Sequence, residues 1–325
     1  MQQALDQASP LAAAQYFQQS LRPTARSTSS SPGTTNCATL SLGNLVHRNF
    51  MLLKNVLGFV SLGITLGLTA IAPVQAETVL ERVARTGELR AATRADAVPF
   101  GFETPDGKLD GYGVDLIGLI GAKLTEKTGK NLTVDLDTVT LENRFTAIAD
   151  GKVDIVCAAT TITQDRLEKV DFSAPFFISG AKFLIKQDTA DSFNVNGSLE
   201  GVPIAYIKGT TTFDIIPQIY PLAKWIPVAD RQAGIAELDA GKVAAVVSDG
   251  ILLVGELLKE GKDPKDYALG PSQPMTTELY ACILPKGDEA WKKFVDEVIA
   301  SEENHNLLQE WFNLDQQNLL QVAPR

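Results

Sequence analysis

Strand-like and helix-like segments alternate along this chain, and the alternation occurs twice. In the first half, the predicted strands are residues 89–93, 132–136 and 153–156, and the predicted helices are residues 112–124 and 144–149. Apolar residues recur at helical spacing in the first helix, whereas the last strand is a short β-branched run of the kind found in buried strands. Strands that alternate with helices predict an α/β fold, with a mostly parallel sheet that carries helices on its faces.

The second half repeats this order after an extended segment, residues 182–186, that we interpret as a connector. The predicted elements are strands at 202–206 and 243–247, a turn at 209–212, and helices at 213–219 and 251–260. A further strand, residues 280–284, follows after the second unit is complete. It could belong to either half. If it rejoins the first, the chain crosses between the halves twice, which makes a hinge possible.

The first 76 residues have a different character. Residues 1–50 include a Ser/Thr-rich stretch at 27–31 and are predicted to be a disordered tail. Residues 51–76 are typical of an export signal, with Lys54 before an apolar run at 56–71 and small residues before Ala76. A membrane anchor is the alternative, but a run of 16 residues is short for a span of about 20. We expect cleavage after Ala76, and translation could start at Met1 or at Met51.

The charge and the cysteine content of the remaining 249 residues limit which functions are possible. Of 29 basic and 39 acidic residues in the chain, 25 and 38 lie after Ala76, a net charge of −13 that argues against nucleic acid as a partner. Cys37 lies in the predicted tail and is removed with it, so Cys157 and Cys282 remain. From the residues alone, a disulfide in an oxidising compartment and two buried thiols are both open.

Hydroxyl and charged side chains follow the predicted strands of both halves. Thr161 to Arg166 comes after the strand at 153–156, with Thr161 and Gln164 spaced as in a capping box. Gly209 to Thr212 and Ser248–Asp249 follow strands of the second half. In open α/β sheets, ligands bind beyond the carboxyl ends of the strands. An arginine that pairs with a carboxylate and an aspartate that meets an ammonium would suit an α-amino acid.

Motifs in the same order as in a known family support this interpretation. They are GYGVDLIGLIGAKL at 111–124, with Gly113 where an acid is usual, Val98-Pro99-Phe100, DGKVDIV, T-I-T-x-x-R ending at Arg166, DFSAPF at 171–176 and GTT at 209–211. The chain resembles the periplasmic solute-binding proteins of family 3, the polar amino-acid class that serves ABC importers. The likeness extends from Glu77 to about Asp315.

The resemblance implies an α/β, two-lobed periplasmic binding protein fold with two crossover strands at the hinge. Residues 77–185 would begin lobe 1, 186–272 would form lobe 2, and 273–325 would return to lobe 1 and end in a helix. The strand at 280–284 would lie in lobe 1 beside Cys157, which favours the disulfide Cys157–Cys282. The implied protein is a periplasmic monomer without cofactor or metal that passes its amino acid to an ABC transporter permease.

The resemblance also assigns roles to individual residues. Arg166 would bind the α-carboxylate with help from Thr161 and Thr211, and Asp249 would hold the α-ammonium. For the ligand side chain, the chain is similar to the glutamate/aspartate-binding branch, in which cations match Arg94, Arg144 and Arg231. We expect Arg231 to lie in a loop of the second half, residues 230–234. We therefore predict L-glutamate or L-aspartate. Because Leu141 and Ala159 stand where that branch tends to place serines, glutamine, asparagine or broad neutral and acidic binding is the alternative.

Two other classes of function are alternatives to binding. The same fold hosts a few lyases, but His305, the one histidine after residue 76, lies in a segment predicted to be the last helix and on its surface. A receptor sensor domain would need a membrane span after the binding core, and hydropathy beyond Ala76 offers none. We expect a binding protein rather than an enzyme.

Overall fold

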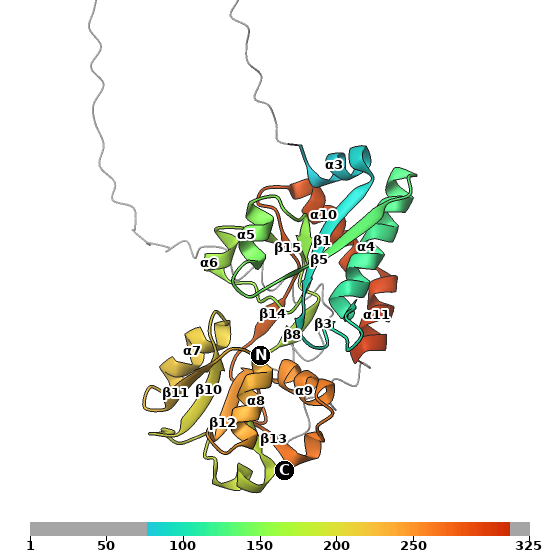
Figure 1. The fold of residues 1–325 in the computed structure, drawn as a ribbon. Helices are drawn as coiled ribbons and strands as arrows, with labels where there is room; N and C mark the ends of the chain where they lie inside the picture. Colours follow the sequence, from blue (N-terminus) through green and yellow to red (C-terminus); the bar gives the residue numbers. More distant parts are fainter. Residues whose placement is uncertain (1–76, 313–325) are drawn as a thin grey trace, which may run out of the picture. The chain divides into compact units, whose positions relative to one another are not determined.

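The computed structural model describes residues 77–312 (Figure 1). The predicted tail 1–50, the predicted signal peptide 51–76 with its cleavage after Ala76, and residues 313–325 lie outside the described residues. Within 77–312, none of the helices combines the length and apolar character that a membrane crossing requires.

The described residues form two five-stranded sheets, two small sheets and the helices that cover them. In chain order, the first part contains α3 (Val79–Thr86), β1 (Glu88–Arg94), β2 (Asp96–Ala97), β3 (Gly101–Glu103), β4 (Leu109–Asp110), α4 (Tyr112–Thr128), β5 (Thr133–Val139), α5 (Arg144–Ala149), β6 (Ile155–Val156), α6 (Gln164–Leu167), β7 (Asp171–Phe172) and β8 (Phe177–Ser179). The middle part contains β9 (Ala181–Lys186), η1 (Gln187–Ser192), β10 (Pro203–Ile207), α7 (Thr211–Ile219), β11 (Lys224–Val228), α8 (Arg231–Asp239), β12 (Ala245–Asp249), α9 (Gly250–Lys259), η2 (Pro264–Asp266) and β13 (Tyr267–Gly270). The last part contains β14 (Glu278–Tyr280), β15 (Ile283–Leu284), α10 (Glu289–Ile299) and α11 (Glu302–Phe312).

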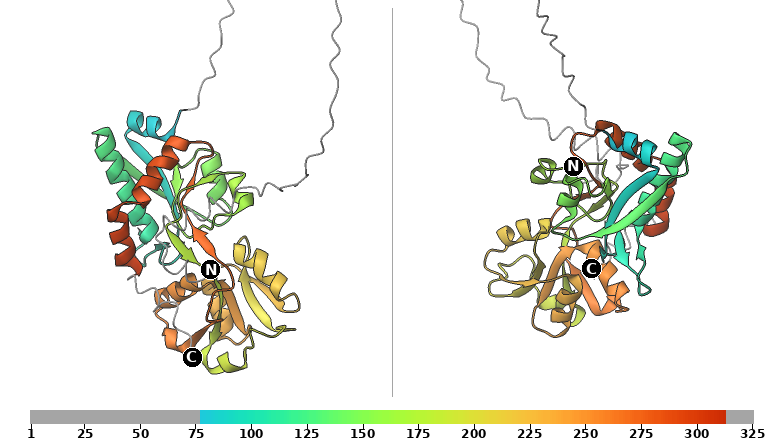
Figure 2. Two further views of the ribbon diagram at one scale, coloured as in Figure 1. Left: turned by 180° about the vertical axis from the view of Figure 1, so that it is seen from behind. Right: turned by 45° about the horizontal axis from the view of Figure 1, so that its top comes forward.

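The first sheet has the strand order β5-β1-β6-β15-β7, and we call the part built on it lobe 1. β1 runs parallel to both β5 and β6, as the alternating pattern predicted, whereas β15 is antiparallel to its neighbours. α10 and α11 pack on α4, and Figure 2 shows these three helices side by side. The predicted helices at 112–124 and 144–149 are confirmed as α4 and α5.

The second sheet has the order β11-β10-β12-β9-β13, and we call the part built on it lobe 2. The predicted strands at 202–206 and 243–247 are confirmed as β10 and β12, which run parallel. The interpretation of residues 182–186 as a connector is wrong, because β9 pairs with β12 on one side and β13 on the other. Residues 181–185, which the sequence assigned to lobe 1, therefore pair within the second sheet. The division of the chain at 185 and 272 otherwise stays a prediction.

Two strands, β8 and β14, pair with each other between the two large sheets. The predicted single strand at 280–284 is interrupted, because β14 pairs with β8 and β15 pairs with the first sheet. Ala281 and Cys282 change partners at the junction: the Ala281 N–H donates to the Thr160 carbonyl, and the Cys282 N–H donates to the Ser173 hydroxyl. The predicted return of this segment to the first sheet is confirmed, so the chain crosses between the sheets twice.

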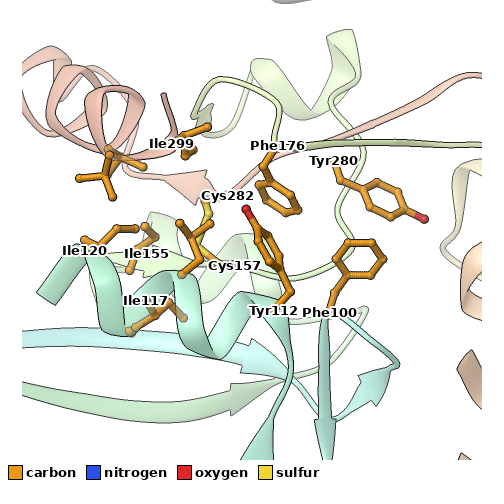
Figure 3. Close-up of a cluster of buried hydrophobic side chains, with 14 of the residues drawn as sticks. Phe100, Tyr112, Ile117, Ile120, Ile155, Cys157, Phe176, Tyr280, Cys282 and Ile299 are labelled. Atoms are coloured by element: carbon orange, nitrogen blue, oxygen red, sulfur yellow. A yellow bond between two sulfur atoms is a disulfide. The ribbon is translucent and has the colours of Figure 1, made fainter. Parts of the chain in front are cut away.

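An aromatic core lies in lobe 1 where it meets these crossing strands. The rings of Phe100, Tyr112, Phe176 and Tyr280 lie near the disulfide between Cys157 and Cys282 (Figure 3). The predicted disulfide is thus confirmed. Phe100 contacts Tyr280 edge-on with ring centroids 5.1 Å apart, so the second crossing strand is packed directly into the core.

Candidate functional site

A cavity of about 300 Å³, including its open mouth, lies where the two sheets face each other. Its lining comes from both lobes: Arg94, Leu141, Arg144, Ala159, Thr161, Arg166, Thr210, Thr211, Thr212, Arg231, Ser248, Asp249 and Leu252. The structure therefore brings together all seven residues that the sequence singled out for ligand binding. Leu141 and Ala159, where hydroxyl groups were considered, also line it.

The cavity lies beyond the carboxyl ends of the strands, as the rule for open α/β sheets predicts. Arg94 is the last residue of β1, and Asp249 is the last residue of β12. Arg144, Thr211 and Arg231 are the first residues of α5, α7 and α8. Because strand ends and helix starts converge there, free backbone N–H groups and the positive ends of helix dipoles lie near the cavity.

Two local predictions from the sequence are wrong. The predicted capping box beginning at Thr161 does not form, because the N-cap of α6 is Thr163, whose hydroxyl accepts from the Arg166 N–H. Thr161 instead forms a single β-bridge with Tyr280 of the crossing strand. Arg231, predicted in a loop, begins α8, because Asp230 caps that helix by accepting from the Ala233 N–H.

Three guanidinium groups of the cavity have no carboxylate partner within residues 77–312: those of Arg144, Arg166 and Arg231. Arg144 and Arg231 are buried. The Cζ atoms of Arg144 and Arg166 lie 4.9 and 5.3 Å from the centroid of the Phe145 ring, which brings these two cations together. The Nε of Arg144 is buried without a hydrogen-bond acceptor.

Burial and mutual repulsion act on these arginines. Burial, followed by the charges of Arg94 and Arg166, lowers the pKa of Arg144 well below its ordinary value. Burial and then Arg94 lower the pKa of Arg231, and burial lowers that of Arg166. Because a buried charge is costly unless it is paired, an anion that joins these groups would be strongly favoured.

Arg94 differs from the other three because it already has a carboxylate. Its Nε and Nη2 donate to the two Asp96 oxygens at 2.8 and 2.6 Å. Although burial raises it, the charge of Arg94 holds the pKa of Asp96 below its ordinary value. Arg231 reaches across from lobe 2, where its Nε donates to Ser248, and its Nη1 donates to the Asp96 carbonyl at 3.0 Å.

Asp249 is the buried carboxylate of lobe 2 in this cavity. It directly precedes α9, but its side chain does not cap that helix. It accepts instead from the hydroxyls of Tyr280 and Thr212. Burial and the charge of Glu278 raise the pKa of Asp249 to about 6. An aspartate that leaves the helix N–H groups unused and points into a cavity is placed to meet a cation from a ligand.

Sequence reasoning missed three polar residues around the cavity: Asp96, Glu278 and the Tyr280 hydroxyl. Glu278 is buried in β14, where its two oxygens accept from Thr211 and Thr276, each at 2.8 Å. The sequence gives a weak indication that Asp96 lies near the site, since it is an acidic residue two positions beyond a strand end. The hydroxyl of Tyr280 carried none, because the strand pattern predicted only a buried ring.

A family model for the bacterial extracellular solute-binding proteins, family 3, matches residues 89–314. The chain belongs to this family. It is 32% identical over 254 residues to the L-glutamate/L-aspartate-binding protein of Pseudomonas aeruginosa, a match that covers 74% of this chain and 83% of that protein. It is 27% identical over 203 residues to the glutamine-binding protein of Geobacillus stearothermophilus, covering 60% of this chain and 76% of that protein.

The fold agrees with solved structures of the same kind. The crystal structure of the ancestral amino acid-binding protein AncCDT-1, a precursor of cyclohexadienyl dehydratase, matches with a TM-score of 0.62 at 26% identity and covers 72% of this chain and 99% of that chain. The predicted family and the predicted two-lobed α/β fold are thus confirmed. Within residues 77–312, no group of His, Cys, Asp and Glu side chains is arranged to hold a metal ion.

Proposed function

We propose that this protein binds L-glutamate or L-aspartate outside the cytoplasmic membrane and delivers it to an ABC importer. One observation supports the proposal that the ligand is acidic. The guanidinium groups of Arg144, Arg166 and Arg231 line one cavity without a carboxylate partner in the described part of the chain. A second carboxylate on the ligand provides a counterion for these guanidinium groups, and a neutral side chain does not. The glutamate/aspartate-binding relative supports the same choice.

In the proposed complex, each end of the amino acid meets an opposite charge. Arg166, Thr161 and Thr211 bind the α-carboxylate, and Asp249 holds the α-ammonium. Arg144 and Arg231 bind the side-chain carboxylate, which lies toward the paired Arg94. We propose a binding role rather than a catalytic one: His305, the histidine within 77–312, is exposed on α11, which agrees with its predicted surface position. The partner is the membrane permease, and residues 51–76 direct export to the periplasm.

A neutral ligand is the second candidate, and two observations favour it. Leu141 and Ala159 line the cavity with apolar groups, so hydroxyl donors are missing there. A glutamine-binding protein is also among the relatives. An amide side chain could accept from one arginine while leaving the others without a counterion.

Calorimetric titration of residues 77–325 with the twenty amino acids, after refolding to remove copurified ligand, decides between them. We expect L-glutamate or L-aspartate to bind more tightly than L-glutamine by about 30- to 150-fold, the effect of a charge-assisted pair of ~2–3 kcal/mol. Glutamine binding as tightly as glutamate would favour the second candidate. Tight binding of lysine with no binding of glutamate would contradict both.

A further inference from the structure

Arg94, which lines the cavity, forms an ion pair with Asp96, which lies next to the cavity. The contact is bidentate, with both Asp96 oxygens accepting from the Arg94 guanidinium. The Arg94 side chain is 2% exposed, whereas that of Asp96 is 42% exposed. The third guanidinium nitrogen of Arg94, Nη1, lies 3.5 Å from the Ala159 carbonyl. Each nitrogen of Arg94 therefore already has an acceptor from the protein.

Asp96 also lies where the cations of the two lobes meet. Its side chain holds Arg94 of β1, and its carbonyl accepts from Arg231 of α8. The neighbouring Arg144 shows the opposite situation, since its Nε is buried without an acceptor. One of the four arginines is thus neutralised by the protein, and three are left for a ligand.

We propose that Asp96 is a specificity-determining residue, an internal counterion that holds Arg94 and assigns the acidic ligand to Arg144, Arg166 and Arg231. The nature of the ligand in this proposal rests on the proposed function. Asp96 acts through Arg94 and need not touch the ligand. Its negative charge lowers the positive potential of the cavity, and so sets how strongly the site prefers an acidic side chain over an amide.

A double-mutant cycle tests whether Asp96 or the ligand satisfies Arg94. Arg94→Ala leaves the Asp96 carboxylate without its partner beside an anionic ligand, so we expect glutamate affinity to fall about tenfold or more. Adding Asp96→Ala removes that repulsion, and the double variant should return to within about threefold of the wild-type affinity. A double variant as weak as Arg94→Ala would show that Arg94 binds the ligand directly, which overturns the proposal.

Asp96→Asn tests the effect of the Asp96 charge, because it removes the charge and keeps the shape of the side chain. We expect the ratio of glutamate to glutamine affinity to rise about fivefold or more, because one negative charge near the ligand is removed. Asp106→Asn is the matched control, since Asp106 is exposed in the turn between β3 and β4 and pairs with Lys108 outside the cavity. That variant should leave the ratio unchanged, and an equal rise in both variants would overturn the proposal.

The two proposals fail in different ways. If the wild-type protein binds glutamine and not glutamate, the proposed function is wrong. The role of Asp96 is then supported if Asp96→Asn gains glutamate binding, and overturned if it does not. Thermal unfolding of each ligand-free variant shows that it is folded, so a change in selectivity at unchanged unfolding temperature reports on the site and not on the fold.

Discussion

Two arginines near the Phe145 ring, Arg144 and Arg166, are proposed to bind different carboxylates of a dicarboxylate ligand. Arg166 lies beside the Thr161 carbonyl, to which its Nη1 donates at 2.7 Å, and next to the helix starts that suit an α-carboxylate. Arg144 is buried more deeply and has no carboxylate partner among the described residues. Ligands that share an α-carboxylate but differ in side-chain charge can therefore separate the two roles.

Arg166→Ala is expected to abolish binding of every amino acid, a loss of about a hundredfold or more, because each ligand needs its α-carboxylate paired. Arg144→Ala should lower the affinity for glutamate by a similar factor and the affinity for glutamine much less. Calorimetry on both ligands measures this. Arg85→Ala is a suitable control, since Arg85 is an exposed partner of Glu77 on α3. Equal losses for glutamate and glutamine in Arg144→Ala would contradict the division of roles.

Asp249 gives the site a predicted dependence on pH. Its pKa of about 6 is raised by burial and by Glu278, so it is ionised at pH 7 and largely protonated at pH 5. A protonated Asp249 cannot pair with the ligand ammonium, so affinity should fall about tenfold between pH 7 and pH 5. Titrations at half-unit steps measure this, and Asp249→Asn should bind weakly with little change over the same range.

The same group should affect the stability of the ligand-free protein with the opposite sign. A folded-state pKa above the unfolded value means that the folded form binds more protons between about pH 4 and pH 6. The contribution of Asp249 to the free energy of unfolding therefore becomes more favourable as pH falls through 6.

For the predicted change in ligand affinity, a constant affinity from pH 7 to pH 5 would show that Asp249 does not hold the ligand ammonium.

Individual residues differ in how far the sequence could place them. Asp249 could be predicted because it follows a strand that the alternating pattern defines. Arg94 and Arg144 also stand at a strand end and a helix start, but the resemblance to the family was needed to assign them to the ligand side chain. The ion pair of Arg94 with Asp96 could not, since it depends on the conformation of the short segment after β1. Gly113, which departs from the family pattern, is explained only by packing: a Cβ there would lie 2.4 Å from the Cys157 carbonyl oxygen.

The disulfide joins two strands that are neighbours in the first sheet but distant in the sequence. Cys157 follows β6 and Cys282 precedes β15, with a sequence separation of 125 residues. The bond therefore fastens the second crossing of the chain to the first sheet, directly beside the loop that carries Ala159 and Thr161. A cross-link over such a distance restricts the unfolded chain most strongly.

Replacing both cysteines by alanine is expected to lower the free energy of unfolding by about 5 kcal/mol, the chain-entropy value for a loop of this length. Urea unfolding of the variant and of the wild-type protein measures the difference. Wild-type protein unfolded in the presence of a reductant should behave like the variant. An unchanged midpoint in the variant would mean that packing of the aromatic core alone holds β15 in place.

Elements with strong periodic patterns were predictable, and elements that depend on tertiary pairing were not. α4 and α5 appear where apolar spacing placed them. The strand at 280–284 was predicted as one piece because its apolar run is continuous, whereas the structure divides it between two partners. α8 was missed although Asp230 is an ordinary N-cap signal, because no clear apolar period follows it.

The two crossings and the cavity between the sheets make ligand binding a property of both lobes. Arg231 of lobe 2 donates to the Asp96 carbonyl of lobe 1, and α9 packs against lobe 1 so closely that a Cβ at Gly255 would lie 2.3 Å from the Val98 carbonyl oxygen. A ligand that bridges the same cavity adds contacts to both sheets at once. It should therefore stabilise the whole folded chain and not one lobe alone.

Thermal unfolding of residues 77–325 at rising glutamate concentration tests this coupling. With glutamate at one hundred times its dissociation constant, we expect stability to increase by about 2.7 kcal/mol, seen as one cooperative transition that moves upward as a unit. Arg166→Ala, which cannot bind, should show no shift at the same concentration and so controls for effects of the solute. Two transitions, of which glutamate moves only one, would contradict a site that both lobes share, because binding free energy stabilises only the parts that must be folded for the ligand to bind.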